Sequence, residues 1–257
     1  MEIDGHKTGG HPGVETFLDE LYEHFKSVRE DTITRLGRGD ALHIIDFHGN
    51  NWIDMNSWIS SKYEGEEWTQ VVFLQFSRLF KEIYWLQFLF HHGNYPMIYR
   101  TLRYILELIA QSYYVDSQYP NLSLDEKMEK TEEIEESVYG WSLVKVVLCE
   151  VSDSTEESIR SNFKPLWDYL NKHVHPSAKQ IDIVATEDFP SLLTDSFNEK
   201  LARDVLRATD EIFDLVNMIV VRKFSRVREL VLQYKFINEW DDYLRNTMRL
   251  VRGQLSV

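Results

Sequence analysis

The sequence predicts a mainly α-helical protein with a small irregular or short-strand segment near its amino terminus. After Glu66, apolar residues recur at helical spacing through most of the chain, and Gly, Pro or capping patterns separate these stretches. The 257 residues are 43% hydrophobic and 13% aromatic, which is enough apolar material for a large core. We therefore predict a helical bundle domain at residues 66–257, with residues 1–65 forming a helix and an irregular segment packed on it.

The amino-terminal part predicts one amphipathic helix followed by an irregular region. Residues 1–13 contain four glycines, a proline and two histidines, which is typical of a flexible start. Residues 14–35 carry apolar side chains at helical spacing and predict a helix that ends at the following glycines. Loose alternation over 42–47, followed by turn residues at 48–51, predicts a short strand or irregular patch.

Two long helices are predicted in the middle of the chain. Residues 66–90 are apolar on more than one side, as expected for a central helix that packs on several neighbours. Gly93 suits the left-handed position that closes such a helix. Pro96 favours the first turn of the next helix, which we predict from Tyr95 to about Val115.

The rest of the chain predicts shorter helices with recognisable ends. Ser123 and Glu126 form a capping-box pattern at the start of an acidic helix. Pro165 requires either an early helical turn or a kink. The remaining predicted helices cover residues 123–139, 141–151, 159–174, 196–220 and 226–250.

Composition excludes several classes of protein. A formal net charge of −14 opposes binding to the phosphate backbone, so we expect no duplex DNA partner. Cys149 is the only cysteine and lies in an apolar run, which fits a reducing compartment and a packing role. We therefore expect a cytoplasmic protein. The most apolar stretch, 71–90, is interrupted by charges and predicts neither a signal peptide nor a membrane span.

The charge is distributed unevenly along the chain. Residues 120–160 contain 11 acidic and 4 basic residues, whereas residues 222–252 contain 8 basic and 4 acidic residues. Such asymmetry could pair two subunits or attract a charged ligand, and we predict a homodimer. The alternative is two solvated helix faces that differ in sign.

Charged residues on the predicted helix that begins at Tyr95 gather on one flank. Successive residues turn by about 100 degrees, so Arg100, Arg103 and Glu107 lie together opposite the apolar side. One interpretation is a polar cleft that these three residues share with a histidine. The alternative is an exposed Arg103–Glu107 ion pair at four-residue spacing, which contributes about 0.2–0.5 kcal/mol.

Two histidines near the end of the predicted helix 159–174 are the candidate titratable groups. His173 lies beside the apolar face, and His175 immediately precedes Pro176. A helix carboxyl terminus stabilises a charged histidine, and an ordinary pKa of about 6.5 suits proton transfer. The alternatives are a core histidine for His173 and a helix cap for His175.

These segments carry a family resemblance. Arg103-Tyr-Ile-Leu-Glu107 and the later Tyr169-Leu-Asn-Lys-His-Val-His-Pro-Ser177 resemble the HEPN-type helical bundles and related prokaryotic families over roughly residues 66–224. The resemblance implies an up-and-down bundle of four or more helices and homodimers with the polar cleft at the interface. In active members it implies metal-independent RNA cleavage by an Arg and a His.

The chain departs from this family at the nuclease motif, an Arg four to six residues before the His on one helix. Neither His173 nor His175 has an arginine at those positions. Arg38 and His43 satisfy the spacing, but they follow glycines in a segment that does not predict a helix, so we interpret the match as chance. Cleavage would then need Arg100 or Arg103 from the neighbouring helix.

No other motif indicates a specific chemistry. The sequence has no glycine-rich phosphate loop, no Cys-x-x-Cys pair and no His-Glu-x-x-His, and we expect neither a metal site nor a cofactor. We predict a dimeric HEPN-like interaction or regulatory module. The alternatives are an RNA-directed nuclease that uses a His and an Arg from neighbouring helices, and a scaffold that binds another protein.

Overall fold

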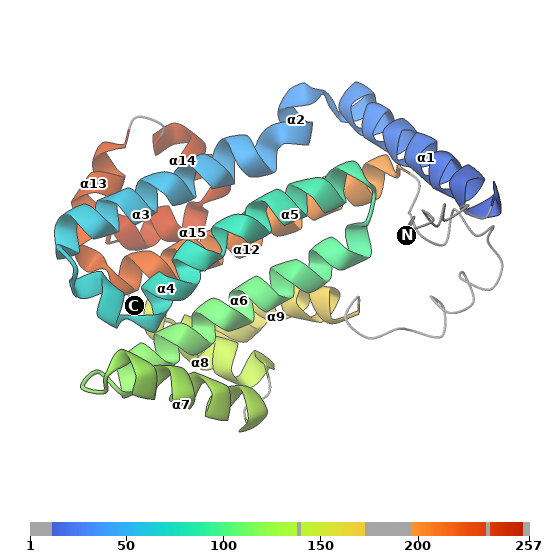
Figure 1. Cartoon of the computed structure of the whole chain (residues 1–257). Helices are drawn as coiled ribbons and strands as arrows, with labels where there is room; N and C mark the ends of the chain where they lie inside the picture. Colours follow the sequence, from blue (N-terminus) through green and yellow to red (C-terminus); the bar gives the residue numbers. More distant parts are fainter. Residues whose placement is uncertain (1–11, 138–139, 173–196, 235–236, 254–257) are drawn as a thin grey trace, which may run out of the picture.

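The protein is mainly helical, as predicted. The computed structural model describes residues 12–137, 140–172, 197–234 and 237–253, and no strand occurs within these ranges. Figure 1 shows α12 running alongside α6 through the middle of the molecule, with α13, α14 and α15 gathered near α3 at one end. Within the described ranges, no helix combines the length and apolar character needed to cross a membrane.

The amino-terminal segment is helical where the sequence predicts a strand or irregular patch. After α1 (Pro12–Leu36), α2 (Arg38–His43) continues into a π-helical turn η1 (Ile44–Gly49) and then α3 (Asn50–Tyr63). The strand prediction is wrong. Ile44 and Phe47 are both buried where the π-helical turn packs on α5 and α12, and an apolar run as short as 42–47 does not distinguish a buried helical turn from a strand. Gly37 separates α1 from α2 with a φ of 90°.

The predicted central helix is divided into three pieces. A 3-10 turn η2 (Glu66–Thr69) leads to α4 (Val71–Arg78) and then α5 (Phe80–His91). Gly93 is left-handed with a φ of 69°, as predicted for the end of this segment. The next helix is α6 (Tyr95–Gln118), capped by the Asn94 side chain, which accepts a hydrogen bond from the Met97 N–H.

Three helices cover one side of α6. They are α7 (Leu124–Ser137), α8 (Gly140–Ser152) and α9 (Glu156–Asn171). The predicted capping box is confirmed, since the Ser123 N–H donates to Glu126 and the Glu126 N–H donates back to Ser123. Pro165 lies inside α9 on its exposed face, where water can reach the carbonyl that loses its helical partner.

The last part of the chain contains one long helix and several short ones. The long helix α12 (Glu199–Lys223) matches the prediction, with Asn198 as its amino-terminal cap. The single helix predicted over 226–250 is wrong. In its place are η3 (Ser225–Val227), α13 (Arg228–Gln233), α14 (Ile237–Tyr243) and α15 (Arg245–Val251). The short helices fold back so that Trp240, Leu244 and Met248 reach the core.

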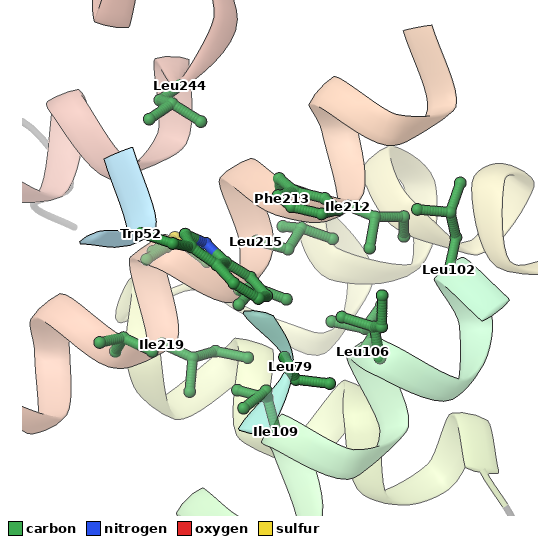
Figure 2. Close-up of a cluster of buried hydrophobic side chains, with 14 of the residues drawn as sticks. Trp52, Leu79, Leu102, Leu106, Ile109, Ile212, Phe213, Leu215, Ile219 and Leu244 are labelled. Carbon is green, nitrogen blue, oxygen red and sulfur yellow. The ribbon is translucent and has the colours of Figure 1, made fainter. Parts of the chain in front are cut away.

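One continuous hydrophobic core joins the amino-terminal helices to the rest of the chain. Figure 2 shows its centre, where Trp52 of α3 lies against Phe213 of α12 and Leu106 of α6 faces the same space. The Trp52 and Phe213 rings are stacked with their centroids 4.9 Å apart. This packing holds the start of α3, which directly follows η1, against α12.

Candidate metal centre

Two histidines from the amino-terminal segment meet an aspartate of the long helix α12. His43 is the last residue of α2, and His48 lies in the π-helical turn. Five residues on an α-helix turn through about 140 degrees beyond a full circle, which would separate the two rings. The π-helical turn bonds each residue to the fifth one along and so brings both histidines to the same side, facing Asp210.

The three polar groups converge on one point. The Nε2 atoms of His43 and His48 lie 2.7 Å and 2.8 Å from the same oxygen of Asp210, Oδ1. The His48 side chain is fully buried, whereas those of His43 and Asp210 are 15% and 18% exposed. One ligand atom from each residue lies within 4.8 Å of the others, a set that could hold a metal ion.

Aromatic rings hold the two imidazoles in place. The His43 ring stacks on Phe47 with a centroid distance of 5.4 Å and contacts Tyr243 at 4.7 Å. The His48 ring lies 4.4 Å from the ring of Phe213. Side chains whose rotamers are fixed by packing need little reorganisation to bind a ligand.

The protonation states suit metal ligation. Burial lowers the pKa of His48, and this effect exceeds the opposing effect of its bond to Asp210. Burial alone would raise the pKa of Asp210, but the contacts with His43 and His48 outweigh it, so the pKa of Asp210 is lowered. A neutral imidazole and an ionised carboxylate are the forms that bind metals.

A cavity of about 580 Å³ opens beside His43 and Asp210. Asp40 of α2, several residues of α12, and Tyr243 and Asn246 from the carboxy-terminal helices form its walls. Its volume is in the range of small-molecule sites. The cavity gives a ligand access to the exposed edges of His43 and Asp210, while His48 lies behind them.

The predicted pair Arg103 and Glu107 lies at a different place. Arg103 Nη2 is 3.0 Å from Glu107 Oε1, and these two side chains are only 19% and 23% exposed. The pair is therefore more enclosed than the exposed-pair alternative assumes, and both residues line a second cavity of about 480 Å³. Arg100 is half-buried on the same helix and is not among the described residues that line this cavity. His173 and His175 lie outside the residues that the structure describes.

The sequence interpretation did not identify His48 or Asp210, and it set His43 aside as part of a chance match with Arg38. Its reason for setting aside Arg38 and His43 is wrong, because α2 runs from Arg38 to His43. The available signal was the five-residue spacing of the two histidines. This spacing places both rings on one side only when a π-helical turn lies between them. The partner Asp210 is 162 residues from His48 and carries no local signal. No protein-family model, curated protein or solved structure matches this chain.

Proposed function

We propose that the chain is a metal-dependent hydrolase whose metal ligands are His43, His48 and Asp210. The observation that carries this proposal is the convergence of two imidazole nitrogens on one carboxylate oxygen at the edge of a cavity. Two histidines and one carboxylate form a known ligand set for a single transition-metal ion and leave coordination positions open.

The spacing of the ligand atoms supports this assignment. Adjacent ligands that each lie about 2.1 Å from an ion are about 3.0 Å apart when they subtend a right angle. The distances of 2.7 Å and 2.8 Å to Asp210 Oδ1 are close to that value, so a small outward movement of the Asp210 carboxylate would admit an ion. The fixed rings of His43 and His48 leave the carboxylate as the group that adjusts.

The charge of the cavity also favours a cation. Five carboxylates line it and three arginines oppose them, which leaves an excess of negative charge beside the ligands. The carboxylates are Asp40, Asp210, Glu211, Asp214 and Asp242, and the arginines are Arg203, Arg207 and Arg245.

The arrangement provides the parts of a hydrolytic reaction. His43, His48 and Asp210 would hold the ion, which when bound would supply Lewis acidity and lower the pKa of a bound water. Glu211 lines the same cavity next to Asp210 and offers a carboxylate that can accept a proton from the attacking water. Arg207 lies on the same wall and can balance negative charge that develops on the substrate.

Metal binding is the first test. Protein freed of metals by a chelator is expected to bind one equivalent of Zn²⁺, Mn²⁺ or Fe²⁺ by titration calorimetry. Replacing His43 by Gln or Asp210 by Asn should weaken binding by about 100-fold or more. Loss of a residue that only hydrogen-bonds a ligand already lowers metal affinity by about 10–100-fold, and loss of the ligand itself lowers it further. His92→Gln, which changes a histidine of the cap after α5, is the matched control. Equal affinity in His43→Gln and His92→Gln would contradict the assignment.

The reaction is tested with the same proteins. Chromogenic phosphoester, carboxylic ester and amide substrates should reveal an activity that a chelator abolishes and one of these ions restores. If the protein binds the ion tightly but hydrolyses none of these substrates, the metal-centre assignment stands and the hydrolase proposal is contradicted.

RNA cleavage without a metal is the second candidate. The observation that favours it is that Arg38 and His43 occupy one helix, as the HEPN-type motif requires, with His43 oriented by Asp210. Cleavage of single-stranded RNA in the presence of a chelator, lost in His43→Ala, would support this candidate against the metal-dependent one. This second candidate also includes the proposal that the helices form a HEPN-like bundle.

A homodimer is the expected assembly in either case. Trp85 and Phe88 of α5 are 45% and 49% exposed and stack on each other at 5.3 Å, and Tyr84 beside them is 52% exposed. Adjacent exposed aromatic rings are enriched at interfaces, and the opposite charges of segments 120–160 and 222–252 favour pairing.

Light scattering should therefore return about twice the 30.6 kDa chain mass. Trp85→Glu should shift the protein to the monomer, because a buried charge opposes the interface. Tyr22→Glu, which alters an isolated exposed aromatic residue on α1, should not. A wild-type protein that stays at 30.6 kDa in low and high salt would exclude the dimer.

A further inference from the structure

A glutamine of α5 holds a histidine of the same helix in its uncharged form. The Gln87 Nε2 atom donates to the backbone carbonyl of Ala41 in α2 and lies 2.7 Å from the Nε2 atom of His91. A carbonyl oxygen only accepts hydrogen bonds, so the contact with Ala41 decides which end of the Gln87 amide is the NH₂ group. The second N–H of this group then donates to His91, whose Nε2 atom therefore carries no proton.

The folded protein offers no acceptor to a charged His91 ring within the residues that the structure describes. Protonation would place an N–H on His91 Nε2 directly against the N–H of Gln87. Turning the Gln87 amide over would not help, because its oxygen would then face the Ala41 carbonyl. The other ring nitrogen of His91, Nδ1, is buried and has no hydrogen-bond partner among the described residues. The charged ring would therefore lose one hydrogen bond and gain none.

The surroundings of His91 also oppose a positive charge. Burial has the largest effect on the pKa of His91, and two neighbouring basic groups act in the same direction. These groups are Arg29 of α1 and His92 at the end of α5, and together with burial they lower the pKa from 6.5 to about 4. The neutral ring is therefore the form that the folded protein favours.

His91 lies where α1 docks on the rest of the molecule. Figure 1 shows α1 outside the bundle, beside the end of α5, and its main contacts are with α2, α5 and α12. The Phe25 ring of α1 meets the His92 ring edge-on, with the centroids 4.7 Å apart, and Val28 is 3% exposed. The next residue is Arg29, which acts on His91. A charge on His91 would be more stable after α1 has moved away, because water could then solvate it.

We propose that His91 is a pH switch, in which the neutral ring allows α1 to dock on α5 and protonation releases α1. The docked form binds fewer protons than the released form between about pH 4 and pH 6.5, so docking weakens as the pH falls through this range. Release would expose Val28 to water. The switch does not depend on the metal centre or on the hydrolase proposal.

Hydrogen exchange on the full chain measures the release. The protection factors of residues 19–36, corrected for the effect of pH on intrinsic exchange, should fall by about tenfold or more from about pH 7.5 to about pH 5. Complete transfer of His91 from a pKa of about 4 to one of 6.5 would give about 30-fold. This fall should be absent in His91→Gln, since the glutamine oxygen can still accept from Gln87 but does not titrate.

A matched control separates His91 from the general effect of acid. His92→Gln changes the adjacent histidine, which also contacts α1, and should keep the wild-type response to pH. Because His91→Gln could disturb folding, NMR titration of the His91 ring in the wild-type protein provides a second measurement. The ring should titrate well below its ordinary pKa of 6.5 while the protein remains folded.

Three results would overturn the proposal. They are an equal fall of α1 protection in the wild type and in His91→Gln, unchanged α1 protection between the two pH values, and an ordinary pKa for the His91 ring in the folded protein.

Discussion

Replacing Asp116 by Ala is expected to lower the free energy of unfolding by about 3–5 kcal/mol, because it leaves a buried lysine without its counter-ion. Asp116 and Lys127 are each 1% exposed, and Lys127 Nζ lies 3.1 Å from Asp116 Oδ1. The N–H of Val72, in the first turn of α4, also donates to Asp116 Oδ2 at 2.9 Å. One carboxylate therefore fixes α6 to both α4 and α7.

Lys127 also has a second partner besides Asp116. Lys127 Nζ donates to the Thr69 carbonyl at 3.1 Å, and Lys223 Nζ of α12 donates to the Asp116 carbonyl at 3.2 Å. Four helices, α4, α6, α7 and α12, and the turn η2 meet at this point. Loss of either member leaves a charge in a place that water does not reach, and relaxation around it is limited by the surrounding helices.

Denaturant melts measure this effect. Lys130→Ala, which removes an exposed lysine paired with Glu133 on the same helix α7, should leave the midpoint nearly unchanged. The losses in Asp116→Ala and Lys127→Ala should be strongly non-additive, because both remove the same interaction. Additive losses in the double variant, or a midpoint in Asp116→Ala equal to that of Lys130→Ala, would show that the pair does not stabilise the fold.

Replacing Asp214 by Ala is the second large expected effect, about 2–4 kcal/mol of stability, because it strips the amino-terminal end of α15 of its acceptor. Asp214 is 3% exposed and belongs to α12. Its Oδ1 accepts from the Thr247 N–H at 2.8 Å, and its Oδ2 accepts from the Asn246 N–H at 2.8 Å. These are the free backbone donors of a helix start, and here a distant residue satisfies them.

Asp214→Ala should destabilise α15 locally as well as lower the free energy of unfolding of the whole protein. Hydrogen exchange of α15 should accelerate in Asp214→Ala more than that of α6, since the removed bonds join α15 to α12. Metal affinity should also fall, because Tyr243, which precedes α15, contacts His43. Asp241→Asn, which alters a surface pair with Arg252 in the same region, is the control and should change neither. Unchanged exchange of α15 in Asp214→Ala would contradict this role.

Local signals in the sequence predicted most helices correctly. The capping box of Ser123 and Glu126, Pro96 in a first turn, and the apolar period of α12 each act within a few residues, so they are readable without the fold. The division of 66–90 at Leu79 and of 226–250 into short helices is not readable in this way. Both segments keep helical composition, and packing against α6 and α12 decides where each helix ends.

The sequence by itself determined the helical class, the positions of most helix starts and the flank on which Arg103 and Glu107 lie. These properties depend on residues within one or two turns of each other, and short-range propensity and periodicity report them. Only the tertiary structure decided that Arg103 stacks on Trp167, and that His43 and His48 face Asp210. Both contacts join segments far apart in the chain, so no local pattern in either segment reports them. For the histidines, the partner segments are held together by the packing of Trp52 and His48 on Phe213.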